Sequence, residues 1–305
     1  MSNIIVAALY QFTPLPNFQD LQQPLKDLCK DAGVKGILLL ADEGINGTVA
    51  GSRSAIDQLL DFLKQHFQAL EYKESWAEVM PFHRIKVRLK KEIVTLGIPE
   101  VSPVIRAGDY VDPQDWNALI AEPDVLLIDV RNDYEVKIGT FQGALNPQTQ
   151  SFRKFPEFVK TLDKSKHRRI AMCCTGGIRC EKASSYMLSQ GFEEVYHLKG
   201  GILKYIETTP PETSLWNGEC FVFDGRVAVG HNLELGEAKI CHGCRIPLTA
   251  IELESSLYER GVSCPHCYDH ISPEKKKAAR HRQMQEDLAQ QRGTKHIGAV
   301  MGSGV

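Results

Sequence analysis

The feature that most constrains the fold of this 305-residue chain is a turn between an apolar strand and a helix. Arg169–Cys173 is an apolar segment that we predict as a strand, and Gly177–Ser189 has the spacing of a helix. Strands that alternate with helices in this way favour a parallel sheet with helices on both faces. The sequence therefore predicts a central α/β domain, with this turn where the sheet meets a helix.

The turn carries Cys174, which we predict to be the reactive nucleophile. Backbone N–H groups of such a turn point inward and a helix N-terminus adds partial positive charge, so both stabilise a thiolate. Glycines let the chain curl tightly around a bound anion or a persulfide. The predicted active-site loop consists of Thr175, Gly176, Gly177 and Ile178.

Three residues beside this loop have further expected roles. Arg179 adds a fixed positive charge and is predicted to be catalytic together with Cys174. Cys180 lies in the first helical turn and is either a resolving thiol, which would form a disulfide with Cys174, or a packing residue. Cys173 ends the strand and better fits the alternative of a buried, inert cysteine.

The first 97 residues predict a separate domain of strands and helices. Their apolar pattern gives the order β-α-β-β-α-β, which is typical of the ferredoxin-like fold. We predict strands at 4–12, 36–41, from 48, 72–79 and 84–95, helices at 18–29 and 54–66, and a turn at Gly44–Gly47.

The rest of the chain divides into four predicted segments. Residues 98–112 contain prolines and a glycine and are predicted as a linker, and residues 113–209 as the central α/β domain. Residues 210–271 are predicted to hold a hairpin and a cysteine-rich region. Residues 272–305 are predicted as a charged helix and a flexible tail.

Four cysteines in the third of these segments have the spacing of a structural zinc site. They form two Cys-x-x-Cys pairs separated by 19 residues, Cys241 with Cys244 and Cys264 with Cys267. Four thiolates would close a tetrahedral shell with no open position, so the predicted role is structural. The alternative is a set of reduced or disulfide-paired thiols. We therefore predict a zinc-ribbon-like segment, preceded by a hairpin at Cys220–Val229 that turns at Asp224-Gly225.

One predicted strand of the N-terminal domain alternates cationic and apolar residues. Because a strand has a period of two, its cations share one face, and Ile85, Val87 and Leu89 share the other. Four cations on one sheet face suit a phosphate backbone, although an ordinary solvated strand face is the alternative. The predicted RNA-binding residues are Arg84, Lys86, Arg88 and Lys90.

Charge and composition narrow the class of protein. The formal net charge is −2, so a nucleic-acid surface can only be a local patch. No apolar run approaches the roughly 18 residues of a membrane span. Nine cysteines without a secretion signal favour a reducing compartment, so we expect a cytoplasmic protein that does not enter a membrane.

Several strings of residues resemble known families. Cys-x-x-Gly-x-Arg after a strand is similar to the loop of the rhodanese domain, as are Asp129–Arg131 with Glu135 and Gly143-Ala144 upstream and Leu198–Ile202 downstream. The longer string Cys174–Ala183, together with Asp42–Thr48 and Gly218–Asp224, resembles the bacterial oxygen-dependent tRNA uridine hydroxylases that contain a central rhodanese domain. That resemblance implies 5-hydroxylation of the wobble uridine of tRNA with O2 as co-substrate. The rhodanese likeness implies a persulfide on the loop cysteine.

Three functions remain open from the residues alone. The first is the tRNA uridine hydroxylase, the second is a sulfurtransferase that moves sulfane sulfur to an acceptor, and the third is a non-enzymatic RNA-binding or redox-sensing adaptor. A sulfurtransferase would explain Cys174 and Arg179 but not the basic strand, and an adaptor would not need a nucleophile loop. The sequence contains no flavin or nicotinamide motif, so the thiol of Cys174 is the reactive centre that it indicates.

Overall fold

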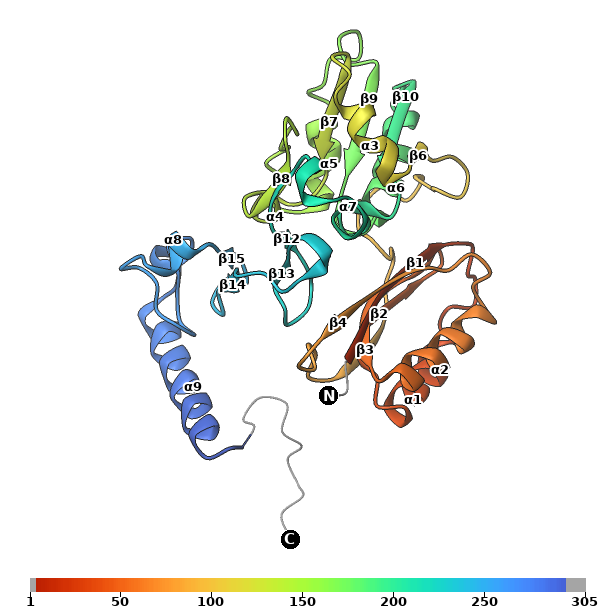
Figure 1. The fold of residues 1–305 in the computed structure, drawn as a ribbon. Coiled ribbons are helices and arrows are strands. Elements are labelled where there is room, and N and C mark those ends of the chain that lie inside the picture. The colour runs from red at the N-terminus through yellow and green to blue at the C-terminus, as the bar shows by residue number, and fades with distance from the viewer. Residues whose placement is uncertain (1–3, 295–305) are drawn as a thin grey trace. The chain divides into compact units, whose positions relative to one another are not determined.

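The computed structural model describes residues 4–294, and these belong to two compact units (Figure 1). Unit one ends at Leu235 and unit two begins at Gly236. The flexible tail predicted within residues 272–305 lies partly outside the described residues, in 295–305. The five-part division that the sequence predicts is finer than this division into two units.

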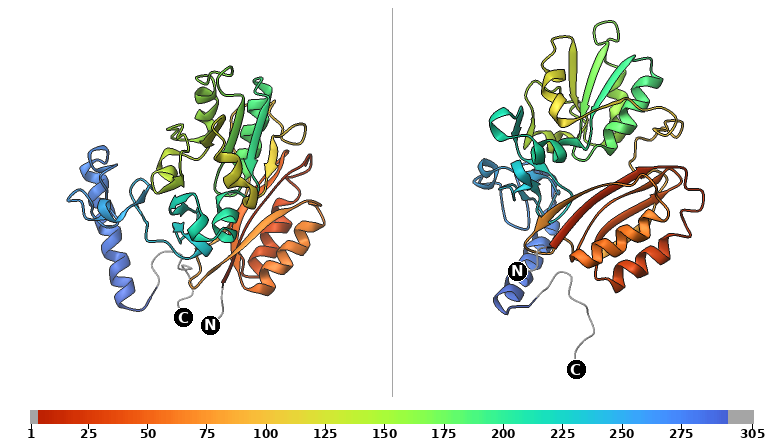
Figure 2. Two further views of the ribbon diagram at one scale, coloured as in Figure 1. Left: turned by 45° about the horizontal axis from the view of Figure 1, so that its top comes forward. Right: turned by 45° about the vertical axis from the view of Figure 1, so that its right-hand side comes forward.

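Unit one begins with a five-stranded sheet that carries two helices on one face (Figure 2). The strands are β1 (Ile4–Phe12), β2 (Lys35–Ala41), β3 (Gly44–Gly51), β4 (Glu71–Ala77) and β5 (Ile85–Leu89), and the helices are α1 (Gln22–Asp31) and α2 (Arg53–Lys64). The order β4-β1-β3-β2, with antiparallel neighbours, confirms the predicted ferredoxin-like fold. β5 adds a strand parallel to β2 at one edge. Alternate apolar side chains of the strands pack against α1 and α2, as the period of two requires.

The turn predicted at Gly44–Gly47 is wrong, because these residues lie inside β3. The chain reverses at Asp42 and Glu43 instead. A Cβ atom on Gly44 would lie 2.0 Å from a backbone oxygen of β1, and one on Gly47 would lie 2.2 Å from a backbone oxygen of β2. These glycines therefore allow neighbouring strands to approach closely and do not reverse the chain.

Two other predicted elements have different ends in the structure. The strand predicted over 84–95 ends at Leu89, because the carboxylate of Glu92 accepts two backbone N–H groups of the turn that follows. The helix predicted from Phe18 begins at Gln22, because the residues before it form separate hydrogen-bonded turns. Both differences concern element ends, which local capping contacts decide.

The second domain of unit one is a parallel sheet with helices on both faces, as predicted. Its strands, in their order across the sheet, are β6 (Asp109–Val111), β10 (Glu194–Leu198), β9 (Arg169–Cys173) and β7 (Val125–Asp129). Its helices are α3 (Pro113–Ile120), α4 (Asp133–Val136), η1 (Phe152–Lys154), α5 (Phe155–Val159), α6 (Ile178–Ser189) and α7 (Gly201–Thr208). One apolar cluster covers each face of the sheet. β6 comes from the segment predicted as a linker and forms an edge of this sheet.

The end of unit one packs onto this second domain in short pieces. They are η2 (Pro211–Thr213), β11 (Trp216–Gly218), β12 (Cys220–Phe221), β13 (Ala228–Val229) and η3 (His231–Leu233), and β11 pairs with β8 (Gly139–Phe141). The predicted hairpin forms, but its paired strands are only two residues long. Arg226 folds back onto the Asp224 carboxylate and Val227 has a φ of +68°, so the extended backbone is interrupted.

A buried lysine joins the two domains of unit one. The Lys182 side chain, on α6, is 1% exposed, and its ammonium lies 2.7 Å from carboxylate oxygens of both Glu43 and Glu92. It also donates to the backbone oxygen of Val94 over 3.1 Å. A buried ammonium requires a partner for each of its N–H bonds, and this one has three acceptors. Removing a partner would leave a charge unpaired inside the protein, so the contact fixes one domain against the other.

Unit two is small, and its apolar cluster is centred on four cysteines. Its elements are β14 (Lys239–Ile240), β15 (Pro247–Leu248), α8 (Ala250–Leu253), η4 (Tyr268–His270) and α9 (Pro273–Gln291). The predicted charged helix is α9, which Ser272 caps by accepting the backbone N–H of Lys275. Within residues 4–294, no helix is long and apolar enough to cross a membrane.

Candidate active site and cysteine cluster

Cys174 directly follows β9, and its side chain has no exposed surface. The backbone N–H of Gly177 donates to the Cys174 sulfur over 3.2 Å, and α6 begins at the next residue. Gly177 can close the loop because it has a φ of +102°, a conformation that side chains disfavour. The sulfur thus lies among backbone donors between a strand end and a helix start.

The surroundings of Cys174 lower the pKa of its thiol. Burial by itself would raise this pKa, because an anion is poorly solvated inside a protein. A hydrogen bond from the Cys180 thiol, the charge of Arg179, and backbone N–H groups of Cys180 and Gly177 outweigh burial and lower the pKa to about 6. The thiolate is therefore the main form of Cys174 at neutral pH, and it can act as a nucleophile without a separate base.

The two neighbouring cysteines are held as thiols. Burial raises the pKa of Cys173 and of Cys180 well above the usual value. The Cys180 thiol donates its hydrogen to the Cys174 sulfur. Formation of a Cys174–Cys180 disulfide would need this kind of contact, and the resolving role stays a prediction.

Arg179 is held by Glu135 of α4, which the sequence indicated as part of the rhodanese resemblance but not as a partner of Arg179. Its two terminal nitrogens lie 2.6 and 2.8 Å from the two carboxylate oxygens of Glu135. One of them also lies 3.2 Å from the hydroxyl of Thr175. Both charged side chains are buried, and the bidentate geometry fixes the orientation of the guanidinium beside the loop.

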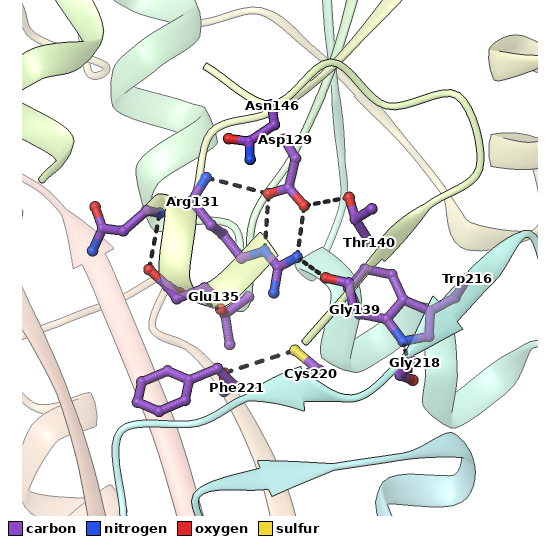
Figure 3. A network of polar contacts seen from close by, with 12 residues as sticks. Asp129, Arg131, Glu135, Gly139, Thr140, Asn146, Trp216, Gly218, Cys220 and Phe221 are labelled. Atoms are coloured by element: carbon purple, nitrogen blue, oxygen red, sulfur yellow. Dashed lines mark hydrogen bonds and ion pairs between the residues drawn. The ribbon is translucent and has the colours of Figure 1, made fainter. Parts of the chain in front are cut away.

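A second buried ion pair supports the site from the end of β7 (Figure 3). Arg131 donates to the two carboxylate oxygens of Asp129 over 2.8 and 2.6 Å, and to the backbone oxygen of Gly139 over 2.5 Å. Thr140 donates to the same carboxylate over 2.8 Å, and the Arg131 guanidinium lies 5.1 Å from the centre of the Trp216 ring. The pair ties β7, β8 and β11 together, so its role is structural.

The loop is also supported by the start of α7. Gly200 and Gly201 have φ values of +76° and +67°. A Cβ atom on Gly201 would lie 2.6 Å from the backbone oxygen of Cys174 and 2.7 Å from that of Thr175. The backbone N–H of Ile202 donates to the Cys174 oxygen over 2.9 Å. Only glycine fits at this approach, which explains why the Leu198–Ile202 string accompanies the cysteine loop.

The N-terminal domain adds two residues to the loop that the sequence did not indicate. Lys73 of β4 donates from Nζ to the backbone oxygen of Gly176 over 2.9 Å. The hydroxyl of Tyr10, on β1, lies 3.1 Å from where a Cβ atom of Gly177 would be. No local pattern could have found either residue, because each meets the loop only when the two domains pack together.

The four predicted RNA-binding residues lie at the other edge of the N-terminal sheet, on β5 and at its ends. Ile85 and Val87 pack into the core below α1 and α2, so Lys86 and Arg88 face the opposite side, as the period of two predicts. Leu89 is 38% exposed, so the apolar face of β5 is not fully covered. In the part of the chain that the structure describes, no ion pair or side-chain hydrogen bond engages any of the four cations.

The structure of unit two brings the four predicted metal ligands together. The sulfur atoms of Cys241, Cys244, Cys264 and Cys267 all lie within 4.8 Å of one another. Individual separations are 3.8 Å for Cys241–Cys267, 3.6 Å for Cys244–Cys264 and 3.8 Å for Cys264–Cys267. This cluster could hold one metal ion.

Comparisons with known proteins match each domain of unit one to a family and match nearly the whole chain to a named relative. Residues 4–93 match the family described as "UPF0176 acylphosphatase like domain", and residues 112–208 match the rhodanese-like domain. A protein of Teredinibacter turnerae named tRNA uridine(34) hydroxylase is 55% identical over 301 residues, which are 98% of this chain and 94% of the relative.

Solved structures match about a third of the chain. The rhodanese-like domain of an Anabaena protein is 23% identical, covers 36% of this chain and 78% of its own, and has a TM-score of 0.30. A rhodanese-related protein of Thermoplasma volcanium is 25% identical, covers 34% of this chain and 95% of its own, and has a TM-score of 0.28.

We predict that iodoacetamide alkylates Cys174 with a pH midpoint of about 6. Below the midpoint the rate should fall about tenfold per pH unit as the thiolate is protonated, and above about pH 7 it should level off. Peptide mass spectrometry between about pH 5 and 9 measures the rate at each cysteine. Cys29 is an internal control, because burial raises its pKa to about 12 and any reaction there should still be accelerating at the highest pH. A Cys174 midpoint above about pH 8 would contradict the prediction.

Proposed function

The chain belongs to the tRNA uridine(34) hydroxylase family, and on that basis we propose that it hydroxylates uridine 34 of tRNA with Cys174 as its reactive thiol. The observation that supports this role for Cys174 is its lowered pKa inside a loop of backbone donors. Arg179, oriented by Glu135, would hold its guanidinium beside the thiolate, and Cys180 would form a disulfide with Cys174. Thr175, Gly176, Gly177 and Ile178 would shape the loop around the sulfur.

We further propose that the hydroxyl group is added at C5 of the ring and that O2 is the co-substrate, as the family resemblance implies. Hydroxylation adds one atom of O2 to the nucleoside, and the other leaves as water with two electrons and two protons from a reductant, which the thiols of Cys174 and Cys180 could supply by forming a disulfide. The source of the added atom can be traced by isotope. A tRNA substrate also supports a cytoplasmic location, to which nine cysteines without a disulfide are suited. Cell fractionation tests the location, and recovery of the protein in the membrane or secreted fraction would overturn it.

A sulfurtransferase is the second candidate, because the same loop could hold a persulfide on Cys174. Backbone N–H groups that stabilise a thiolate would also stabilise the terminal sulfur of a persulfide. The contact of Lys73 with Gly176 favours the hydroxylase, because a rhodanese domain that acted alone would not need a second domain at its loop. The two candidates differ in the nucleoside that disappears when Cys174 is lost.

We predict that replacing Cys174 with Ser removes the hydroxylated uridine from tRNA. Nucleoside mass spectrometry of total tRNA is applied to cells that lack the chromosomal gene and carry the wild-type or the variant chain. Growth under ¹⁸O₂ should add about two mass units to the product if O2 is the oxygen source. Cys220→Ser is a matched control, because that thiol is also buried and burial raises its pKa to about 12. Loss of thiolated nucleosides in place of hydroxylated ones would support the sulfurtransferase.

We propose that the basic strand contacts the tRNA backbone beside this site. The register of the sheet places Lys86 in the same row as Ile37, Thr48, Ala8 and Lys73, so Lys86 and Lys73 lie on one face. That face is opposite to α1 and α2, and Lys73 extends from it to the Cys174 loop. A backbone bound along β5 would therefore run on the sheet face that leads to the reactive sulfur, with Arg84 and Lys90 extending the contact at the strand ends.

We predict that the double variant Lys86→Glu/Arg88→Glu binds tRNA about tenfold more weakly at moderate salt than the wild type. The slope of log affinity against log salt should fall by about one for each phosphate contact that is lost. Filter binding over a salt series measures both quantities. Lys30→Glu/Lys64→Glu is the matched control, because it makes the same charge change on the exposed faces of α1 and α2. Equal effects of the two double variants would refute a contact at β5.

We propose that the cysteine cluster of unit two holds a structural zinc ion. With Zn–S bonds of about 2.3 Å, a tetrahedral shell separates its sulfur atoms by about 3.8 Å. Three of the six separations, Cys241–Cys267, Cys244–Cys264 and Cys264–Cys267, are 3.6 to 3.8 Å and fit such a shell, and all six are within 4.8 Å. Four protein ligands leave no open position, so the ion would stabilise unit two and take no part in the reaction.

We predict that the purified protein contains about one zinc ion per chain and that Cys264→Ser loses most of it. Because the cluster forms the apolar centre of unit two, metal loss should expose the segment from Gly236 to protease while Cys174 alkylation stays unchanged. Elemental analysis and limited proteolysis measure the two effects. Cys29→Ser is the control and should keep its zinc. Wild-type zinc content in Cys264→Ser would show that the ion is bound elsewhere.

A further inference from the structure

The N-terminal sheet brings a tyrosine to the Cys174 loop. Tyr10 lies near the end of β1, and its hydroxyl approaches Gly177, whose backbone N–H binds the Cys174 sulfur. Lys73, beside it on β4, reaches the next loop residue, Gly176, with its ammonium 5.9 Å from the centre of the Tyr10 ring. The loop belongs to the second domain of unit one, and the side chains of Tyr10 and Lys73 bring the N-terminal domain into contact with it.

The hydroxyl of Tyr10 is buried and makes no hydrogen bond of good geometry in the described chain, although the Glu181 carboxylate and the Tyr110 hydroxyl lie close enough to interact with it. Tyr10 is only 6% exposed, because its ring packs with Phe12, Ala41 and Ile93. A buried polar group without a partner destabilises the folded protein, and the large majority of such groups are paired. A buried hydroxyl beside a reactive cysteine that lacks a well-formed hydrogen bond is therefore a position where a ligand could supply a better partner.

The surroundings keep this hydroxyl protonated. Burial, and after it the charge of Glu181, raises the pKa of Tyr10 far above its usual value. The same two causes, in the same order, raise the pKa of Tyr110, which stacks on His197 with the ring centres 4.2 Å apart. At neutral pH Tyr10 thus keeps its proton and can donate a hydrogen bond to an acceptor on a bound group.

We propose that Tyr10 donates a hydrogen bond to a carbonyl oxygen of the target pyrimidine and thereby positions the ring at Cys174. The proposal rests on the function proposed above. In uracil the O4 carbonyl is bonded to C4, the neighbour of C5, so a donor on O4 that lies beside the loop holds C5 close to the sulfur. Enzymes that act on a base outside its stack commonly read it through such hydrogen bonds.

The route to this position passes Lys73. The Cys174 sulfur and the Tyr10 hydroxyl are both closed to solvent, whereas the Lys73 side chain is partly exposed and lies against the start of α7 as well as the loop. A base that enters from the sheet face replaces the contact of Lys73 with Gly176. The released ammonium would then face the incoming nucleotide, whose negatively charged phosphate attracts a cation.

The test is Tyr10→Phe, which removes only the hydroxyl. In cells that lack the chromosomal gene and express the variant at a limiting level, hydroxylated uridine in tRNA should fall at least about fivefold, the effect of losing one hydrogen bond of ordinary strength. The melting temperature should stay the same or rise, because the hydroxyl that is removed makes no hydrogen bond of good geometry. The pH midpoint of Cys174 alkylation should not change, because Tyr10 acts on the base and not on the sulfur.

Tyr186→Phe is the matched control, because Tyr186 is equally buried on α6 but packs in the apolar cluster of the second domain. Three results would overturn the proposal: wild-type modification by Tyr10→Phe, a clearly lowered melting temperature, or a shifted alkylation midpoint. A lowered melting temperature would show that the hydroxyl forms a stabilising hydrogen bond, with Glu181 as the nearby acceptor. A shifted alkylation midpoint would show that the hydroxyl acts on the Cys174 thiolate. If Cys174→Ser also keeps full modification, the proposed function itself fails, which separates the two ideas.

Discussion

The architecture of unit one depends on keeping one sulfur negatively charged where no water reaches it. An ion that leaves water without compensation costs several kcal/mol, yet the buried Cys174 has a lowered pKa. Among the contacts that outweigh burial, the hydrogen bond from Cys180 is the largest, followed by the charge of Arg179. Glu135 neutralises the guanidinium of Arg179. Hydrogen-bond donors in contact with the sulfur therefore lower the pKa of Cys174 more than the net charge around it does.

A loop that depends on short contacts must be held rigidly, and the supports come from far apart in the sequence. The start of α7 supports the loop through Gly201, and α4 holds Arg179 through Glu135. The N-terminal domain reaches the loop through Lys73, and its own position is fixed by the three acceptors around Lys182. A change in the packing of the two domains would therefore alter the loop itself, although the loop belongs to only one of them.

The sequence predicted well what neighbouring residues decide. The strand, turn and helix around Cys174 follow from a local apolar pattern, and Lys86 and Arg88 share a face because a strand has a period of two. Prediction from the sequence failed where a residue distant in the chain determines the local structure. Gly44 is an example, because it allows close contact between strands and does not form a turn. Tyr10 shows the same limit, because it resembles any core residue of an apolar strand until the second domain is placed against it.

The two parts of unit one that we propose to be functional, β5 and the Cys174 loop, are compatible with a single bound RNA segment. β4 and β5 are the edges of one five-stranded sheet, and with about 4.8 Å between neighbouring strands they lie about 19 Å apart. Lys73 and Lys86 occupy the same face and the same row across that sheet. A few nucleotides of an RNA loop span such a distance, so phosphates held at β5 could leave a base at the Cys174 loop. The width of the ferredoxin-like sheet would then set the distance between the bound RNA backbone and the reacting base. The rhodanese domain alone does not contain β5 and could not set this distance.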